Sequence, residues 1–407
     1  MKERVVVTGM GAVTPLGLCV AETWQNLIDG QSGIKIIDPP VNSQVSVGGV
    51  VENFDPEKYI PGKELPRIHR SAQFSCAAIT EAVQDAGLKN ISPEDIGIRM
   101  GTGIGGGGEI AEMEDIILKY GDHKISQYSM LRLLPERVST IPSRLGNLRG
   151  PTATTVAACA TGSMAIIDGY YTLSLDDAKV MVVGGSEAVV HRIGVGGFNA
   201  MRALSRKGSK PERISRPFDK KADGFVMSEG AAVLVLERLE HAEQRGARIH
   251  AEIVGYGNTS DAFHDTVPSG EGAVRAMRIA LEKACLKPED VDYINAHGTS
   301  TVVGDGKELD ALSEVFGKSL RRISVSSTKS ATGHMLGAAG AIEAIFCIKA
   351  IEEGIVPPTL NLRNPIRPGL DLVKGKAKHK EVNVAMSNSF GFGGINSVLI
   401  FKKFGGR

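Results

Sequence analysis

The sequence has little that would suit it to a membrane or to a polyanion. Its 407 residues contain no apolar run near the roughly 18 unbroken residues of a membrane-spanning helix. The formal net charge is only +1, so no overall field attracts nucleic acid or an anionic lipid surface. The N-terminus enters an apolar segment almost at once and shows no secretory signal. We expect a protein that binds neither nucleic acid nor membranes and lies in the cytoplasm or, in mature form, in a plastid or mitochondrial matrix.

Cysteine is also scarce, and its spacing excludes two structural uses. The five cysteines are an odd number, and none belongs to a CxxC motif or another paired spacing. This pattern argues against a disulfide framework and against a zinc site, and it favours reduced thiols. Cys76 and Cys347 lie in amphipathic helical patterns, and we interpret them, with Cys19 and Cys285, as residues that fill the core.

Glycine, by contrast, is abundant, with 49 residues. The glycines are spread among short apolar segments of the kind that form strands buried on both faces. These segments alternate with amphipathic helices, which predicts an α/β fold in which helices cover central sheets. The clearest helices are at 71–86, 162–175, 273–285 and 338–353. The ten predicted strands are 4–10, 96–102, 155–159, 179–185, 231–237, 251–257, 291–296, 323–328, 382–388 and 397–403.

Three pairs of segments recur in the same order and predict a duplicated chain. We expect two halves, 1–249 and 250–407, with two sheets that share an internal layer of helices. The first half carries the longer insertions, mainly across residues 105–150. The paired segments are VQDAGLKNISPEDIGIRMGTGI with LEKACLKPEDVDYINAHGTST, CATGSMA with SATGHML, and VLVLERL with VLIFKKF.

The middle pair of segments makes Cys159 a candidate nucleophile. It aligns Cys159 with Ser330 and Ser163 with His334, so two corners facing each other across a pseudo-twofold axis would bring Cys159 and His334 into one pocket. Cys159 lies where a predicted strand gives way to a helix, and the backbone N–H groups there favour a thiolate. An activated nucleophile is one interpretation, and a small core residue is the other.

Three further corners carry residues of catalytic type. His297 ends a predicted strand in NAHGTST and can be catalytic or structural. Lys329 lies in an otherwise uncharged stretch. Glu343 lies in an apolar helical run, where an unpaired carboxylate is costly to bury, so we expect a partner such as Lys329, a histidine or a cation. The glycine-rich segment around Phe390 suggests either a backbone that bends around a ligand or a turn with two core aromatic residues.

With these corners assembled, the sequence resembles the β-ketoacyl-[acyl-carrier-protein] synthases of the thiolase superfamily, and most closely their elongating type II members. The resemblance covers residues 1–404. It implies the five-layered αβαβα thiolase-like fold, a homodimer and acyl carrier protein as partner. The motifs that carry it are ACATGS, NAHGTST, STKSATGHMLGAAGA, NSFGFGGIN and RPFDKKADGFVMSEGAAVLVLE.

The resemblance also implies the reaction. An acyl group is held as a thioester on Cys159, and decarboxylative Claisen condensation with malonyl-[acyl-carrier protein] lengthens it by two carbons. Backbone N–H groups of Cys159 and Phe390 are expected to hold the oxyanion. No nucleotide or redox cofactor is required.

Residue by residue, Cys159 matches the acyl-accepting nucleophile, and His297 and His334 match the histidines of the decarboxylation site. Lys329 matches the lysine that orders this site, and Glu343 the buried glutamate near it. Phe390 matches the gatekeeper phenylalanine, and the substrate and acyl-tunnel positions are Ile104, Phe198, Thr299 and Thr301. The monovalent-cation site of some members corresponds to Asn295, Ala296, Glu343, Ser387 and Asn388. The basic carrier-docking patch corresponds to Lys63, Arg67, Lys124, Arg202, Arg206 and Lys207.

Several alternatives stay open at this point. Polyketide and mycolate condensing enzymes share the same corners. A coenzyme A thiolase usually has a second cysteine in a CxG motif near its C-terminus, where this chain has NSFGFGG. Gly101, Gly103 and Gly106 fit the GxGxxG pattern of a dinucleotide-binding oxidoreductase, but no clear ribose-binding acid follows a later strand. A non-catalytic scaffold is the remaining alternative.

Overall fold

A ten-stranded sheet forms the centre of the computed structural model, which describes residues 3–38, 45–206 and 210–405. Nine strands overlap their predicted segments closely. The tenth, β5, ends at Thr155, where its predicted segment begins, because Ala158–Ala160 form a 3-10 helix instead. The strands are β1 (Val5–Val13), β4 (Ile96–Gly101), β5 (Thr152–Thr155), β6 (Val180–Glu187), β7 (Gly230–Arg238), β8 (Ala251–Ser260), β9 (Tyr293–Asn295), β10 (Ser324–Ser326), β13 (Val384–Gly391) and β14 (Ile395–Lys402).

The order of the strands is the same in the two halves of this sheet. It is β5-β4-β6-β7-β1 in the N-terminal half and β10-β9-β13-β14-β8 in the C-terminal half. In both halves the first strand therefore lies at the centre of the whole sheet, and the third strand lies at its outer edge. A duplicated chain explains this repeat.

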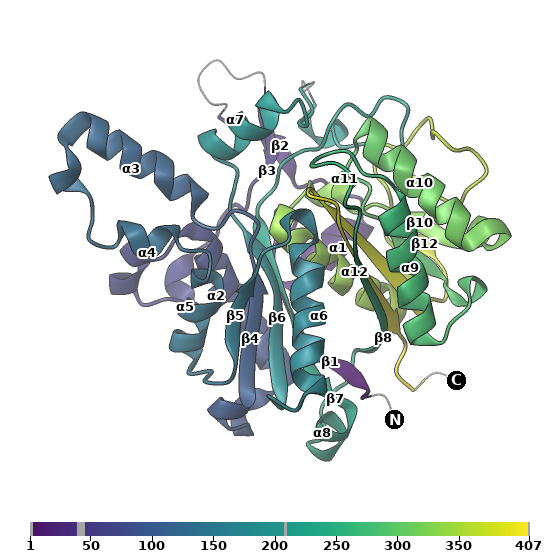
Figure 1. Cartoon of the computed structure of the whole chain (residues 1–407), viewed down its shortest axis with the longest axis horizontal. Coiled ribbons are helices and arrows are strands. Elements are labelled where there is room, and N and C mark those ends of the chain that lie inside the picture. The colour runs from purple at the N-terminus through teal and green to yellow at the C-terminus, as the bar shows by residue number, and fades with distance from the viewer. Residues whose placement is uncertain (1–2, 39–44, 207–209, 406–407) are drawn as a thin grey trace.

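The expectation of two separate sheets is wrong. β1 and β8 pair in antiparallel fashion over three residue pairs, Val5 with Ile253, Val6 with Glu252 and Val7 with Ala251. Each of these strands would otherwise expose one unpaired edge, and pairing satisfies its backbone groups. The two halves thus form one continuous sheet that folds around the helices between them (Figure 1).

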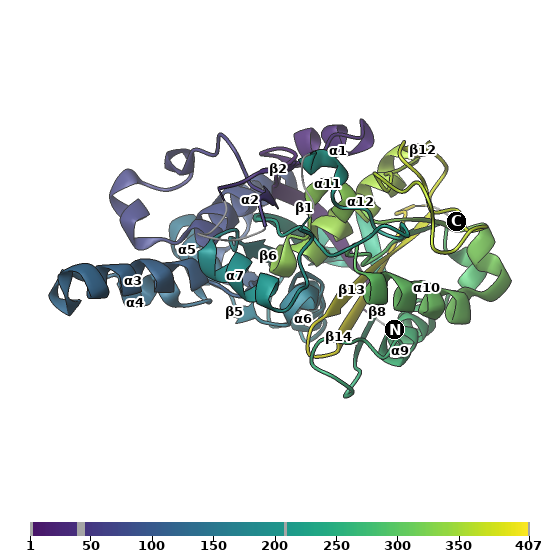
Figure 2. The ribbon, with the colours of Figure 1, turned by 90° about the horizontal axis from the view of Figure 1, so that it is seen from above.

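Three helical layers cover the sheet, and each has its own hydrophobic core. The inner layer consists of α6 (Thr161–Ser174) and α12 (Ala339–Glu353), which pack against strands of both halves. Outside the N-terminal half lies α2 (Arg70–Ala86). Outside the C-terminal half lie α9 (Glu271–Ala284) and α10 (Val302–Phe316). The arrangement is the five-layered αβαβα fold, as expected (Figure 2).

The insertion at 105–150 forms three helices at one end of the molecule. α3 (Gly107–Tyr120) and α4 (Ser129–Leu133) project from the layers, and α5 (Arg137–Gly146) packs against α2 (Figures 1 and 2). Across the described ranges, no helix has the length and apolar character to cross a membrane. The remaining elements are α1 (Val20–Ile28), β2 (Ile34–Ile36), β3 (Val47–Gly49), α7 (Arg192–Ala200), α8 (Leu239–Gln244), α11 (Lys329–Thr332), β11 (Ile355–Val356) and β12 (Lys378–His379), besides short 3-10 turns.

The alignment of Cys159 with Ser330 is wrong. α6 and α12 each begin directly after a one-turn 3-10 helix, and the first residue of that turn has a positive φ in both cases, 48° at Ala158 and 43° at Leu336. Cys159 therefore corresponds to Gly337. The connection from β10 to α12 is the longer one, and its extra residues include α11 and His334.

The two inner helices touch each other through one glycine on each. A Cβ added at Gly162 would lie 2.7 Å from the Ala341 nitrogen, and one added at Gly340 would lie 2.9 Å from the Ser163 nitrogen. In the corrected alignment these contacts are equivalent, so they mark the pseudo-twofold relation between the halves. The close approach brings the first turns of α6 and α12 together.

This contact predicts opposite effects for two Gly→Ala substitutions in helices. Gly340→Ala should lower the free energy of unfolding by about 1–3 kcal/mol, because the added methyl group overpacks the helix contact. Gly306→Ala in α10, where an added Cβ meets nothing within 4 Å, should leave stability unchanged or raise it by up to about 1 kcal/mol. Urea unfolding of both variants tests this, and equal effects would contradict the proposed contact.

Candidate active site

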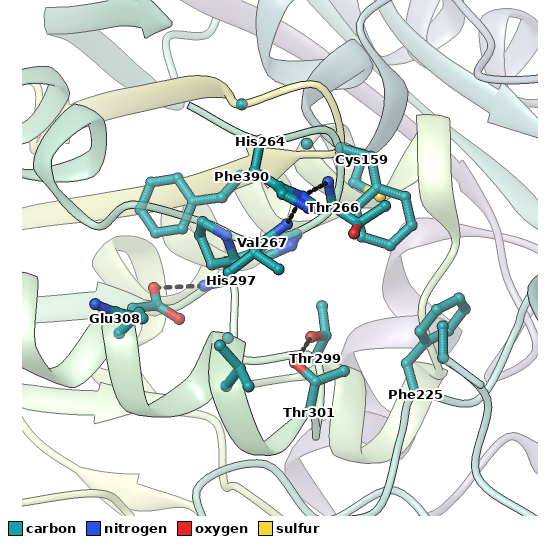
Figure 3. Close-up of a pocket in the computed structure, with 18 of the residues that line it drawn as sticks. Cys159, Phe225, His264, Thr266, Val267, His297, Thr299, Thr301, Glu308 and Phe390 are labelled. Carbon is teal, nitrogen blue, oxygen red and sulfur yellow. Dashed lines mark hydrogen bonds between the residues drawn. The ribbon is translucent and has the colours of Figure 1, made fainter. Parts of the chain in front are cut away.

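One cavity of about 600 Å³ collects most of the predicted catalytic and substrate-binding residues. The predicted residues in its lining come from five separate segments: the turn before α6, α7 and the residues after it, the loop after β9, the connection before α12 and the end of β13 (Figure 3). Ile104 does not line this cavity and is 38% exposed in the loop after β4. The predicted residues in the lining are Cys159, Phe198, Arg202, His297, Thr299, Thr301, His334 and Phe390.

The two histidines lie next to each other, almost perpendicular. Their ring centres are 5.5 Å apart with an interplanar angle of 86°. Phe390 packs 5.7 Å from the His297 ring, and Phe225 packs 5.3 Å from the His334 ring. The prediction that Cys159 and these histidines share a pocket is confirmed by the lining of the cavity.

Both imidazole rings are neutral at pH 7. Burial lowers the pKa of His334 and of His297 well below the usual value, and the positive charge of Lys329 lowers both further. Both ring nitrogens of His334 and Nδ1 of His297 are buried without a hydrogen-bond partner in the described structure. Buried polar atoms normally have partners. These nitrogens are therefore available to a ligand in the cavity.

The backbone of each histidine is held firmly. Glu308 in α10 accepts from the His297 N–H (2.8 Å) and the Gly298 N–H (2.7 Å) (Figure 3). The His334 N–H donates to the Val226 carbonyl (2.7 Å). Sequence reasoning missed Glu308, because a helical glutamate without a motif around it reads as a solvated charge.

Cys159 is a neutral thiol in this closed cavity. Its side chain is buried, and burial raises its pKa to about 12, although the positive charge of Lys329 and the backbone N–H of Phe392 oppose the rise. The expected preference for a thiolate at the helix start is therefore not observed, since desolvation outweighs it here. A reaction at Cys159 needs a base or a change in solvation.

The backbone N–H beside the Cys159 sulfur belongs to Phe392, two residues after the predicted Phe390. Gly391 makes this approach possible, because a Cβ added there would lie 2.8 Å from the Ala157 carbonyl oxygen. The Phe392 ring packs 6.3 Å from the Phe198 ring and also lines the cavity. The glycine-rich segment thus bends closely around the cysteine, as expected, but Phe392 provides the nearer donor.

Behind the histidines, Lys329 and Glu343 form an ion pair in which each side chain is only 1% exposed. Burial raises the pKa of Glu343 to about 7, and the Lys329 ammonium group opposes this rise. The expectation that Glu343 has a charged partner is confirmed. The second carboxylate oxygen of Glu343 has no partner among the described residues.

Two protein-family models match successive parts of the chain. Beta-ketoacyl synthase, N-terminal domain, matches residues 2–242, and Beta-ketoacyl synthase, C-terminal domain, matches residues 250–363. The chain belongs to the β-ketoacyl synthase family. Relatives named 3-oxoacyl-[acyl-carrier-protein] synthase 2 are 44% identical over 410 residues in Synechocystis and 43% identical over 409 residues in Staphylococcus aureus, and each alignment covers 99% of both chains.

Solved ketosynthase structures share the fold over the whole length of the chain. The ishigamide ketosynthase/chain length factor has a TM-score of 0.93 and 34% identity, with 100% of both chains covered. A β-ketoacyl synthase from Burkholderia phymatum has a TM-score of 0.91 and 35% identity, covering 98% of this chain and 99% of the other. The thiolase-like ketosynthase fold is thereby confirmed.

In this β-ketoacyl synthase the residues expected around a cation lie on both faces of the sheet. Alternation along β9 and β13 turns Asn295 and Ser387 toward the inner layer and Glu343, and the Ser387 hydroxyl has no partner in the described part of the chain. The Asn388 side chain faces the outer layer, where its amide donates to Glu308 (3.2 Å), and Ala296 packs there. Oxygen atoms suit a hard cation. Asn295, Ser387 and Glu343 fit such an ion on the inner face, whereas Asn388 Oδ1, also buried without a partner among the described residues, lies on the other face.

The predicted docking residues lie in two groups. Arg202 lines the cavity just after α7, and Arg206 donates to the Asn199 side chain (3.2 Å). Lys63 and Arg67 belong to the 3-10 segment Gly62–Arg67, and Lys124 to the 3-10 turn Asp122–Lys124, away from the cavity lining. Lys207 lies outside the described residues. Of the described docking residues, only Arg202 lines the cavity.

All five cysteines are free. Cys76 and Cys347 are buried, as predicted. The core-filling interpretation is wrong for Cys285, which is exposed at the C-terminal cap of α9, and for Cys19, which is partly exposed and accepts the Glu22 N–H at the start of α1. Both thiols lie at helix ends, where apolar periodicity no longer indicates burial.

The buried ion pair predicts a pH-dependent loss of stability in Lys329→Met. The folded-state pKa of Glu343, about 7, lies above its ordinary value of 4.5, so its contribution to stability is complete below pH 4.5 and is lost as the pH rises through 7. Lys329→Met should lower the free energy of unfolding by about 3–5 kcal/mol at pH 8 and by less at pH 6, because the ionised Glu343 carboxylate then has no positive partner.

Urea unfolding at both pH values measures this effect. The matched control is Lys349→Met in α12, since Lys349 pairs with Glu352 (2.9 Å) and Glu353 (2.7 Å) nearer the surface. It should cost about 1 kcal/mol or less. A pH-independent loss in Lys329→Met, or losses of equal size in the two variants, would refute the assignment.

Proposed function

We propose that this β-ketoacyl synthase elongates fatty acyl chains by condensing malonyl-[acyl-carrier protein] with an acyl group bound to Cys159. The observation that carries the proposal is one cavity that holds a cysteine and two neutral histidines with unpartnered ring nitrogens. The cysteine comes from the proposed N-terminal half, 1–249, and the histidines from the C-terminal half, 250–407. Full-length relatives named 3-oxoacyl-[acyl-carrier-protein] synthase 2 support the same reaction.

In the first stage, the Cys159 sulfur attacks the carbonyl carbon of an acyl-carrier thioester. A neutral imidazole in the cavity takes the thiol proton, because the thiol does not ionise by itself in this setting. The backbone N–H groups of Cys159 and Phe392 stabilise the tetrahedral oxyanion, and loss of one such donor typically raises the barrier by roughly 3–4 kcal/mol. The carrier sulfur leaves and receives the proton. The acyl group remains on Cys159.

In the second stage, malonyl-carrier loses its carboxylate as carbon dioxide, and the electron pair passes to the thioester as an enolate. His297 and His334 each donate an N–H to the enolate oxygen, which neutral rings can do. The enolate carbon attacks the acyl carbon, and the Cys159 sulfur leaves as a thiolate. One proton taken up from solvent restores the thiol and balances the negative charge that the malonyl carboxylate brought. The product is a β-ketoacyl thioester on the carrier, two carbons longer.

The ion pair of Lys329 and Glu343 orders this centre. Burial lowers the pKa of both histidines and the Lys329 charge lowers it further, while the same charge favours the Cys159 thiolate, so Lys329 supports both stages. A structural monovalent cation held by Asn295, Ser387 and Glu343 belongs to the proposal, and it would fix the Glu343 carboxylate that anchors Lys329. Phe198 lines the acyl cavity, Thr299 and Thr301 contact the substrate arm, and Ile104 stays a predicted tunnel residue.

The partner in both stages is acyl carrier protein. Support comes from a structural neighbour described as a type II polyketide synthase acyl-carrier protein in complex with its ketosynthase, which has a TM-score of 0.89 and 31% identity over 99% of this chain. A homodimer, a cytoplasmic location and independence of nucleotide and redox cofactors complete the proposal.

A polyketide-type ketosynthase is the second candidate, because one structural neighbour is described as the ketosynthase of a type II polyketide synthase. Its identity of 31% is lower than the 43–44% of the relatives named 3-oxoacyl-[acyl-carrier-protein] synthase 2. Successive additions of malonyl units without reduction between them would favour the polyketide reading.

The roles of the three reactive side chains predict separable defects. Cys159→Ala should accept no acyl group but retain some malonyl decarboxylation. His297→Ala and His334→Ala should form the acyl-enzyme yet fail to elongate it, because the enolate loses its donors. Mass spectrometry of the acylated protein and a condensation assay measure both steps, with Cys285→Ser as a control that should behave like the wild type. Acylation of Cys159→Ala, or elongation by either histidine variant at the wild-type rate, would contradict these roles.

The basic residues at the cavity predict a salt-sensitive interaction with the acidic carrier. Arg202→Glu and Arg206→Glu should raise KM for acyl-carrier substrates and weaken its dependence on salt, while kcat changes little. Lys318→Glu, an exposed residue of the turn after α10, should change neither and serves as control. An unchanged KM in both arginine variants would remove these residues from the docking surface.

A further inference from the structure

We propose that Glu187 is a positioning residue of this active site, an inference that rests on the proposed function. Glu187 is the last residue of β6 and is fully buried. It holds the loop after β4 against the turn that opens α12. In this way it fixes the turn whose first residue, Leu336, packs in one hydrophobic cluster with Cys159.

The Glu187 carboxylate binds two segments that are far apart in the sequence. It accepts from the Thr102 hydroxyl (3.0 Å), the Gly103 N–H (2.7 Å) and the Ile104 N–H (3.3 Å) after β4, and from the Gly337 N–H (3.0 Å) before α12. Burial raises the pKa of Glu187, and these four donors oppose the rise. The glycine-rich stretch after β4 is thus occupied by a carboxylate of the chain itself, which explains why the dinucleotide interpretation of Gly103 is wrong.

Two glycines allow the three groups to meet. A Cβ added at Gly103 would lie 2.7 Å from Glu187 Oε2. One added at Gly337 would lie 2.7 Å from the same oxygen and 2.5 Å from the Gly103 nitrogen. At Gly337 no other residue type fits without a shift of the backbone, and at Gly103 an added Cβ would displace the Glu187 carboxylate. The junction is therefore tight, and its geometry depends on the length of the glutamate side chain.

This junction bears directly on Cys159. Leu336, next to Gly337, has a φ of 43°, a conformation that is costly for a non-glycine residue and persists only when its surroundings enforce it. The Leu336 side chain packs in one hydrophobic cluster with Cys159 and Phe225. The bond from the Gly337 N–H to Glu187 holds this strained turn in place. The Glu187 charge also opposes ionisation of the Cys159 thiol.

The test compares Glu187→Gln and Glu187→Asp with a matched control. Glu187→Gln removes the negative charge and replaces one acceptor oxygen with an amide NH₂ group that donates. Glu187→Asp keeps the charge but shortens the side chain. The control is Glu237→Gln, because Glu237 is equally buried but lies at the opposite end of the paired strands β6 and β7, bonded to His241 and Arg245. The measurements are kcat and KM for condensation and the pH profile of Cys159 alkylation by iodoacetamide.

Both Glu187 variants should lose about 10- to 100-fold in kcat with little change in KM, since small displacements of reacting groups are costly and the carrier surface is untouched. Only Glu187→Gln should move the alkylation profile of Cys159 to lower pH. Glu237→Gln should show neither effect. Three charged groups act on this thiol, namely Lys329, Glu187 and Glu343. The charged or titratable residues that line its cavity are Arg202, Asp223, Asp261, His264, Asp265, His297, Lys307, Glu308 and His334.

The proposal is wrong if Glu187→Gln condenses at the wild-type rate or leaves the alkylation profile unchanged. If the Glu187 variants do not fold, Thr102→Val removes one of the four contacts in a folded protein. It should lower kcat by a smaller factor, and an unchanged kcat would again overturn the proposal. If the wild-type protein itself fails to condense, the proposed function fails, while the alkylation profiles still test the placement of Glu187 beside Cys159.

Discussion

The close contact between α6 and α12 is the constraint on which the active site depends. Gly162 and Gly340 let these helices approach until backbone meets backbone. Each helix connects the third and fourth strands of the main sheet in its half. Their contact therefore places the first turn of one helix beside the first turn of the other. Cys159 precedes α6 and His334 precedes α12, and the cavity between them follows from the helix contact. The hydrogen bond from the Gly337 N–H to Glu187, the last residue of β6, also holds the turn before α12 in this position.

Burial has the largest effect on the ionisation of the reactive groups in this cavity. Burial keeps the Cys159 thiol and both imidazoles neutral. The positive charge of Lys329 acts on all three groups. A neutral imidazole can both take a proton and donate an N–H, which the two stages of condensation require. The carboxylates of Glu187 and Glu308 hold successive backbone N–H groups after β4 and β9, one in each half. Similar geometry in both halves thus supports different chemistry.

The sequence predicted the strands, the main helices and the shared cavity because these depend on local apolar patterns and on motifs that survive duplication. It failed where the answer depends on spatial contacts. The alignment of Cys159 with Ser330 followed the letters ATG, whereas the positive φ values of Ala158 and Leu336 place Cys159 opposite Gly337. The pairing of β1 with β8 has no sequence signal. Glu187, Glu308 and the donor role of Phe392 appear only once distant segments are placed side by side.

The crystal structure of the acyl-enzyme tests the central claim most directly. The account predicts a thioester on Cys159 whose carbonyl oxygen lies about 2.7–3.1 Å from the backbone N–H groups of Cys159 and Phe392, with the rings of His297 and His334 facing the acyl carbon. An acyl group attached elsewhere, or a thioester oxygen that points away from both N–H groups with the histidine rings out of reach, would contradict it.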